Sequence, residues 1–397
     1  MTGARSPEQL GAVTRLTLAD VLGTEVDGAD EAARQLAAGA FGIAADQVAA
    51  GVHLDQVAYP FGSPATGGLV RLVGTRTDGT PWSLFCKVLQ HVRHWPVLAL
   101  MPPHIVSFFA EGFPWRQELA LWDEITQATL PTGLRSPLLH RIIDLGDERL
   151  AVWMEDVDET DIAWDLTTYA RAAELLGRWN ARSSTPGIFA TYPAPVNFGM
   201  AKYAENGVPD RGLKPLADDD LWGHPWLTDH GDLRARLRKL AGEIPGILDR
   251  TAAMPMALPH GDASPQNLLR PAGCPDTFVA IDVSFRAPHA VGFDLGQLLI
   301  GRAHASLIPM TLLPAIADVI LPAYVDGLSA EGIDCDIDDV RYAFAGYLLI
   351  RSGFDGFLYT LLGHDVDDVA ARQVFDERVD LERFISGFAL EAGIGTG

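Results

Sequence analysis

Cysteine and basic side chains are both scarce in this 397-residue chain. Its three cysteines, Cys86, Cys274 and Cys335, are far apart and provide neither a disulfide framework nor a paired-cysteine metal site, which favours a reducing, cytoplasmic compartment. Lysine and arginine number 30 against 52 aspartates and glutamates, a formal net charge of −22. Because nucleic acids and anionic lipids bind cationic surfaces, we expect neither a nucleic-acid partner nor a membrane partner.

The sequence also lacks a segment that we would interpret as a leader or a membrane span. Its first residues, MTGARSPEQLGAV, contain no apolar core of the kind found in signal peptides. Residues 307–325 are apolar and long enough to cross a bilayer, but they include Pro309, Pro314, Pro322 and Asp318. Prolines free backbone groups and a carboxylate is costly in lipid, so we expect a buried, proline-punctuated helical segment.

What remains is the composition of a globular protein, with 48% hydrophobic and 21% charged residues. At about 150 residues per domain, the length corresponds to two or three domains or to one large fold in two lobes. Residues 52–61, 69–75 and 82–89 have the composition of strands, and an Asp-Gly pair within residues 77–80 is typical of a hairpin turn. An antiparallel meander is therefore predicted here.

The next stretch adds one helix and two strands. A helix is predicted over residues 114–126, and short apolar runs at 138–145 and 150–154 flank a Gly-Asp-Glu turn. This completes five strands and one helix by about residue 155.

The remainder of the chain is predicted to be helical. Apolar residues recur with a period near 3.6 over residues 165–182, and residues 233–250 are helical again. Between them, residues 186–226 are rich in proline, glycine and aromatic side chains, which predicts a long irregular connection. From Gly292 onward helices dominate to the end.

These elements predict an α+β protein with two lobes. We expect an N-terminal helical extension over residues 1–50, a small five-stranded antiparallel N-lobe over residues 51–155, and a large helical C-lobe over residues 156–397.

The strongest local signal is the segment LPHGDASPQNLL, residues 258–269, in which Asp262 precedes Asn267 by five residues. A short apolar strand then ends at Asp282, and Asp294 follows twelve residues later. One carboxylate can accept a proton from an attacking hydroxyl, while a second carboxylate and an amide oxygen can hold Mg²⁺ through hard oxygen ligands. The pattern is therefore suited to metal-assisted phosphate chemistry.

The His-Gly-Asp motif, the Asn five residues beyond the Asp, the Ile-Asp pair and the later Asp-Leu pair together resemble the aminoglycoside phosphotransferase/choline kinase-like family. The resemblance spans residues 52–299 and implies a protein-kinase-like fold. It also implies a Mg²⁺-dependent phosphotransferase that moves the γ-phosphate of ATP or GTP to a hydroxyl group of a small molecule.

The resemblance assigns roles to five residues by their position in these motifs. Asp262 would orient and deprotonate the acceptor hydroxyl, and Asn267 and Asp282 would bind Mg²⁺. In the third strand, Lys87 would neutralise nucleotide phosphates, held in place by Glu118 of the following helix. Phosphoryl transfer relies on such positioning and charge neutralisation more than on covalent chemistry.

Further nucleotide contacts are implied less specifically. Gly62 and Ser63 lie in a small-residue loop, residues 62–68, that could bring backbone N–H groups close to phosphates. Backbone groups around Glu155 and Val157 correspond to the hinge that binds adenine.

Several other polar residues have a predicted supporting role. His260 is expected to brace the catalytic loop, and Asp294 to cap its helix and bond to that loop. Arg286 and His289 are candidates for contact with phosphate or acceptor, although both could equally be structural.

Some positions depart from the family pattern, and they leave the acceptor open. Ser264 stands where the family often has a His or an aromatic residue, and Gln266 where it often has a Gly. Val283 stands where the family often has an aromatic residue, and Asn180 where it often has a His. Since none of these changes removes an essential group, catalysis is expected.

Only the charge of the C-terminal region bears on the identity of the acceptor. Residues 305–397 carry sixteen acidic residues against five arginines and no lysine. This surface would attract a cationic acceptor such as an aminoglycoside or a choline-like amine, unless it is simply a solvated acidic surface. Alternatives are a kinase of a metabolite (a sugar, an amino alcohol or a nucleoside derivative) and a nucleotide-binding pseudokinase. The sequence leaves the oligomeric state open.

Overall fold

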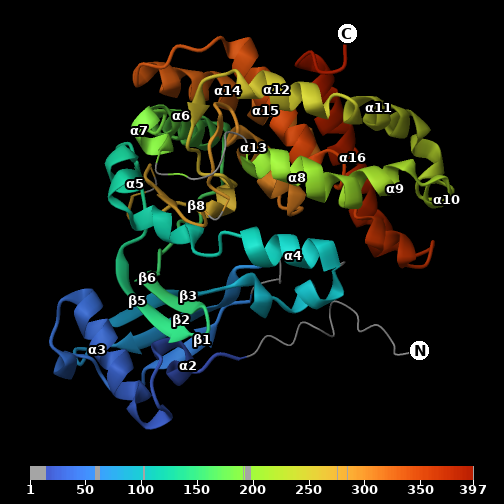
Figure 1. Ribbon diagram of the computed structural model, residues 1–397. Coiled ribbons are helices and arrows are strands. Elements are labelled where there is room, and N and C mark those ends of the chain that lie inside the picture. Colours follow the sequence, from blue (N-terminus) through green and yellow to red (C-terminus); the bar gives the residue numbers. More distant parts are fainter. Residues whose placement is uncertain are drawn as a thin grey trace. The chain divides into compact units, whose positions relative to one another are not determined.

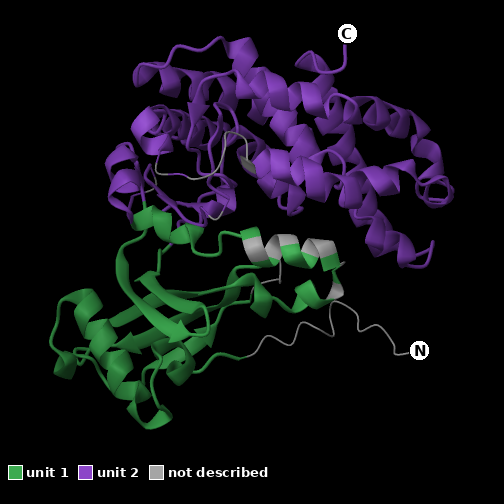
Figure 2. Cartoon of the chain, viewed as in Figure 1, with its two compact units in different colours: residues 1–122, 136–158 green, residues 123–135, 159–397 purple. Residues whose placement is uncertain are grey.

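The computed structural model describes residues 15–58, 63–101, 103–190, 192, 198–274, 276–283 and 285–396. The chain forms two compact units, coloured separately in Figure 2. The first unit contains residues 1–122 and 136–158, and the second contains residues 123–135 and 159–397. The chain therefore enters the second unit for a short segment, returns to the first, and then crosses for good.

The first unit is built on a five-stranded antiparallel sheet in the order β1-β2-β3-β6-β5, which confirms the predicted meander (Figure 1). The strands are β1 (His53–Gln56), β2 (Thr66–Thr75), β3 (Pro81–Gln90), β5 (Leu139–Gly146) and β6 (Arg149–Glu155). Alternation places Val70 and Leu72 of β2 in the core while Arg71 between them is exposed. Lys87 of β3 pairs in register with Leu69 and Val152.

Two N-terminal helices, α2 (Leu18–Leu22) and α3 (Ala29–Phe41), contribute to the core of this unit. Thr17 and Asp20 form a capping box at the start of α2. Trp153 of β6 is fully buried and donates its indole N–H to the carbonyl of Val21 at 3.2 Å. The helices that precede the sheet are thus part of the same compact unit as the sheet.

The helix predicted over residues 114–126 is wrong in detail. The structure has a 3₁₀ helix, η5 (Gln117–Trp122), and then a separate helix, α5 (Glu124–Thr129). Asp123 breaks the two because its side chain accepts from the N–H of Thr126 at 2.6 Å and so begins a new helix. An additional helix, α4 (Pro103–Gly112), was not predicted.

In the second unit, α6 (Leu166–Arg182) packs closely against α14 (Leu313–Ala330). The predicted start of α6 is confirmed, because Asp165 accepts from the N–H of Thr168 at 2.7 Å. The segment Met310–Ala330 is long and apolar enough to span a membrane by length and composition alone. Eight residues of α14 are buried, and we interpret it as a core helix of this unit.

The irregular connection predicted over residues 186–226 is also wrong, because most of it is helical. It contains α7 (Pro186–Phe189), α8 (Phe198–Val208), a π-helical turn labelled η6 (Pro209–Leu213), α9 (Lys214–Ala217) and α10 (Asp219–Trp222). Pro186 stands in the first turn of α7, where a missing N–H costs little. Pro209 and Pro215 stand at the starts of η6 and α9 within a continuous helical run, residues 198–217. The prolines of this segment are therefore accommodated within helical structure rather than in loops.

Further helices complete the second unit, and those at residues 295–304 and 337–352 contact α14. The helix predicted over residues 233–250 is split into two, and the full set is α11 (Gly231–Ala241), α12 (Ile244–Ala252), α13 (Leu295–His304), α15 (Ile337–Ser352) and α16 (Val369–Glu391).

Two small sheets hold the loops of the second unit. Strand β4 (Leu134–Arg135) pairs in parallel with β9 (Phe278–Ala280), which pairs antiparallel with β8 (Leu268–Leu269). A second pair joins β7 (Met256–Ala257) to β10 (His289–Ala290). The segment with the His-Gly-Asp motif therefore runs from β7 to β8, with both ends fixed.

Candidate active site

The loop between β7 and β8 requires a glycine between His260 and Asp262. Gly261 has φ 93°, a conformation that side chains rarely adopt. A Cβ at this position would lie 2.5 Å from the carbonyl carbon of Phe285. The chain can thus make this turn, and direct Asp262 as it does, only with glycine at residue 261.

Asp294 anchors the loop from the start of α13. Its carboxylate accepts from the N–H groups of His260 at 3.0 Å and Gly261 at 2.9 Å, and from the amide of Asn180 at 3.1 Å. The predicted bond to the catalytic loop is therefore present. The predicted cap is not, since the side chain of Asp294 makes no capping hydrogen bond to its own helix.

His260 braces the loop as the sequence suggested. Burial lowers the pKa of this histidine, so the neutral ring is favoured. Its Nδ1 accepts from the N–H of Asp262 at 3.2 Å, and its ring meets Trp179 edge-on with centroids 6.0 Å apart. The ring thereby fixes the backbone on the N-terminal side of Asp262.

Asp262 and Asn267 are brought together by the fold of the loop. The side-chain N–H₂ of Asn267 donates to the Asp262 carbonyl at 2.9 Å and to its Oδ2 at 3.1 Å. Desolvation raises the pKa of Asp262, nearby Arg351 opposes that rise, and the charge of Asp282 adds to it. A carboxylate of raised basicity is suited to accept a proton.

Asp282 follows β9 in a strained conformation. Its φ is 56°, in the left-handed region that non-glycine residues rarely occupy. The N–H of the preceding Ile281 donates to the carbonyl of Asn267 at 3.0 Å, which links the end of this strand to the β7–β8 loop. Strain at a polar side chain is a common mark of functional sites.

The residues present fit a magnesium ion better than an all-protein metal cage. Among the residues that the structure describes, no group of three His, Cys, Asp or Glu side chains gathers around a common point. Because the N–H₂ of Asn267 is directed at Asp262, its Oδ1 faces away and can act as a ligand. An amide oxygen, the Asp282 carboxylate and nucleotide phosphates form the kind of partial shell that Mg²⁺ accepts.

Arg351, in the last turn of α15, was missed by the sequence analysis. It donates from one terminal nitrogen to Oδ1 of Asp262 at 2.8 Å and from the other to the carbonyl of Gly261 at 2.7 Å. Its guanidinium also lies 5.4 Å from the ring centroid of Phe285 and 6.0 Å from that of Phe293. A single cation in the apolar run FAGYLLIRSGF was the available signal, because an isolated charge in such a run needs a partner.

Arg286 and His289 belong to the core. Arg286 is 3% exposed and lies over the ring of Trp179 at 4.6 Å. His289 is 1% exposed and stacks on Phe293 with centroids 3.9 Å apart, and burial lowers its pKa to about 3. Neither side chain is accessible to a phosphate or an acceptor in this structure.

In the first unit, Lys87 and Glu118 form the predicted ion pair. The two side chains are 9% and 4% exposed, and Glu118 reaches Lys87 from the 3₁₀ helix η5 rather than from an α-helix. A buried ion pair is seldom a net source of stability, because two charges lose their hydration. Its presence in the core therefore points to a function.

The predicted phosphate loop is shorter than expected. Gly62 lies outside the described residues, and Ser63 precedes a turn in which its carbonyl accepts from the N–H of Thr66 at 3.3 Å. Gly67 and Gly68 are already in β2, where a Cβ would lie 2.8 Å from Oε1 of Gln90 and 2.6 Å from Leu16, respectively. Close packing accounts for these two glycines.

The predicted hinge residues lie at the end of β6. Glu155 is its last residue, and its N–H donates to the carbonyl of Leu138 at 2.9 Å. Val157 follows in an irregular segment after the last β3–β6 pair, Leu84 with Glu155. The backbone at Val157 is therefore not part of the sheet ladder.

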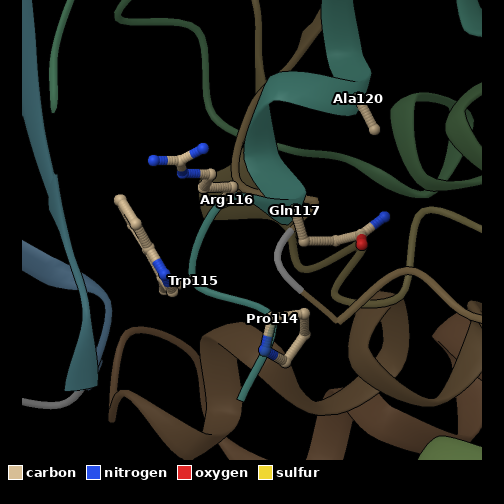
Figure 3. A pocket seen from close by; sticks show the side chains of 5 residues that line it. All are labelled: Pro114, Trp115, Arg116, Gln117 and Ala120. Carbon is tan, nitrogen blue, oxygen red and sulfur yellow. The ribbon is translucent and has the colours of Figure 1, made fainter. Parts of the chain in front are cut away.

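A surface hollow of about 350 Å³ lies in the first unit, beside η5. It is lined by Pro114, Trp115, Arg116, Gln117 and Ala120, and the Arg116 guanidinium stacks 4.6 Å from the Trp115 ring (Figure 3). None of the predicted site residues lines it, so it is not the predicted site.

Sequence comparisons give no relative of this chain. No protein-family profile matches the sequence. A search of curated protein sequences also gives no match.

Solved structures do resemble it. A spectinomycin phosphotransferase with ADP and spectinomycin bound is 11% identical, with 86% of this chain and 93% of that chain covered and a TM-score of 0.50. An aminoglycoside phosphotransferase from Alicyclobacillus acidocaldarius is 12% identical (81% and 90% covered, TM-score 0.49). An ethanolamine kinase from Plasmodium vivax is 10% identical (85% and 83% covered, TM-score 0.45). The chain therefore has the α+β, protein-kinase-like fold of the aminoglycoside phosphotransferases and choline kinase-like enzymes, as its motifs indicated.

Proposed function

We propose that the protein is a kinase of a small molecule: a Mg²⁺-dependent phosphotransferase that moves the γ-phosphate of ATP or GTP to a hydroxyl group. The observation that carries the proposal is the cluster in the second unit, where Asn267 donates to Asp262 and the end of β9 brings Asp282 to the same loop. The buried pair of Lys87 and Glu118 in the first unit supports it. The fold shared with a spectinomycin phosphotransferase that has ADP bound supports it as well.

In the proposed reaction Asp262 acts as the general base. The acceptor hydroxyl donates its hydrogen bond to the Asp262 carboxylate, and its oxygen attacks the γ-phosphorus. The new oxygen–phosphorus bond forms as the bond to the β,γ-bridging oxygen breaks, the proton passes to Asp262, and the nucleoside diphosphate leaves.

The other residues supply position and charge. Asn267 and Asp282 would hold the Mg²⁺, which when bound neutralises phosphate charge. Lys87 would neutralise further phosphate charge, and Glu118 keeps its ammonium group in a fixed position. Ser63 would contact the phosphates. Backbone groups at Glu155, the last residue of β6, and at Val157 would contact the base of the nucleotide.

Phosphate transfer from Mg·ATP and Mg·GTP to a library of sugars, amino alcohols, nucleosides and aminoglycosides tests the proposal. Phosphorylated products are identified by mass spectrometry. Asp262→Asn and Asp282→Asn should each lower the rate about 1,000-fold, since each removes a charge that the reaction needs.

The matched control is Asp276→Asn. Asp276 is exposed on the β8–β9 hairpin that carries Asn267 and Asp282, so this variant should keep full activity. Tight binding of Mg·ATP without transfer to any acceptor or to water would contradict the proposal and identify a pseudokinase.

A further inference from the structure

Arg351 combines an anchored guanidinium with unused hydrogen-bonding capacity. Of its five N–H groups, two donate to Asp262 and Gly261. The other three donate to no residue in the described part of the chain, and the side chain is 22% exposed. The carboxylate that it holds, that of Asp262, is 23% exposed. A cation with free donors therefore lies directly beside the proposed base, where the acceptor hydroxyl must sit.

The acidic cluster at residues 334–339 is not at this place. Asp336 caps the first turn of α15, whereas Arg351 is in its last turn. At 1.5 Å per residue, these ends are about 20 Å apart. Within the same cluster, Asp338 pairs with Arg341 and Asp339 pairs with Arg250. These carboxylates cap a helix or pair with arginines, so this cluster gives no support for a cationic acceptor at Arg351.

The acidic residue nearest to Arg351 along the chain also has hydrogen-bond and ion-pair partners. Asp355, four residues further on, accepts from the hydroxyl of Tyr203 at 3.0 Å and pairs with Arg211 at 2.8 Å. Asp262 and Asp355 thus each have an arginine as partner, and neither is left to pair with an ammonium group.

From this arrangement we infer that Arg351 is the specificity-determining residue of the acceptor site, and that the acceptor carries an oxyanion beside its reacting hydroxyl. The inference rests on the proposed function. The oxyanion, a carboxylate or a phosphate ester, accepts from the free N–H groups of Arg351, whose planar fork suits either group. The same guanidinium holds Asp262, so that binding the oxyanion also places the hydroxyl against the base. An ammonium group at this position is repelled by the guanidinium.

Binding of matched compounds that differ only in charge tests this inference. Glucuronate, glucose 6-phosphate, glucose and 6-amino-6-deoxyglucose share a skeleton, as do D-glycerate, glycerol and 3-aminopropane-1,2-diol. Affinities are measured by calorimetry on the full-length protein without nucleotide. We expect at least one anionic member to bind about ten-fold more tightly than its ammonium counterpart, and the phosphate and carboxylate arms identify which oxyanion is preferred.

Arg351→Met should abolish this preference, and Arg351→Lys should keep part of it because the charge remains. The matched control is Arg341→Met, on the same helix, which removes an exposed pair with Asp338 and should bind like the wild type. If Arg351→Met fails to fold, as judged by circular dichroism, the lysine variant carries the comparison.

Three binding results would each overturn the inference: no binding of any anionic member, equal or tighter binding of the ammonium members, or an unchanged preference in the Arg351 variants. Since the assay involves no nucleotide and no turnover, its outcome is independent of the proposed function. Anion binding without phosphate transfer would defeat the proposed function alone, and transfer to cationic acceptors would defeat only the inference.

Discussion

At the scale of single residues, the site depends on backbone conformations that most side chains cannot adopt. Gly261 and Asp282 both have positive φ, and they lie on either side of the β8–β9 hairpin. At Asp282 the strain is carried by the proposed metal ligand itself, whereas at Gly261 it is avoided by having no side chain.

Gly261→Ala should therefore harm both stability and activity. The added Cβ would meet the backbone of Phe285 at 2.5 Å in an unfavourable conformation, so we expect a loss of about 2–3 kcal/mol in the free energy of unfolding. Urea denaturation and phosphate-transfer assays measure the two effects. Gly273→Ala, with no atom within 4 Å of the added Cβ, is the control, and an equal loss in both variants would contradict the argument.

At the scale of elements, α6 and α14 approach each other through two glycines. A Cβ on Gly177 would lie 2.2 Å from the carbonyl oxygen of Tyr324, and one on Gly327 would lie 2.2 Å from that of Glu174. Because backbone faces backbone at both points, a side chain at either position must push the helices apart.

Gly327→Ala should thus lower the free energy of unfolding by about 2–4 kcal/mol. The control is Gly387→Ala in α16, where the new Cβ meets nothing within 4 Å. There alanine should stabilise the protein by about 0.5–1 kcal/mol, because it loses less backbone entropy than glycine. Thermal unfolding of both variants measures the difference; a destabilised Gly387→Ala would refute the distinction.

Sequence patterns predicted the elements whose stability is local. The strand composition of residues 69–75 and 82–89 and the 3.6 period over residues 165–182 predicted β2, β3 and α6, and the structure contains all three. The patterns missed a local signal at Asp123, whose side chain accepts from the N–H of Thr126 and so divides one expected helix into two. Arg351 is 89 residues from its partner Asp262, and no local spacing could connect them.

At the scale of the whole molecule, a buried histidine should make the protein sensitive to acid. His289 titrates with a pKa of about 3 in the folded state, against 6.5 for the ordinary group. Below pH 6.5 the unfolded chain binds a proton that the folded chain does not, so stability falls from pH 6.5 towards pH 3.

The variant His289→Phe, which can keep the ring stack on Phe293, should remove that part of the acid sensitivity. At pH 5 the difference from the wild type should be about 2 kcal/mol relative to pH 7. Urea denaturation at both pH values measures it. His53→Gln, at a side chain 61% exposed, should leave the pH dependence as in the wild type, and a similar effect of both changes would count against His289 as the cause.

The three crossings between the units also restrict how the protein can be divided. Residues 123–135 supply β4 to the sheet with β9, and Thr129 accepts from the indole of Trp179 at 3.1 Å. A fragment of residues 159–397 lacks these contacts and should be insoluble or unfolded, whereas residues 123–397 should fold. Circular dichroism of the two fragments distinguishes them; a well-folded shorter fragment would be the contrary result.

Residues 123–135, which belong to the second unit although the chain on both sides belongs to the first, restrict how proteins of this fold can be recombined. A chimaera that takes its sheet-bearing unit from another protein of this fold needs three junctions rather than one. A chimaera with a single junction near residue 158 would combine β4 and α5 of the other protein with β9 of this chain. Successful chimaeras should therefore keep the native residues 123–135 as an island inside the transplanted half.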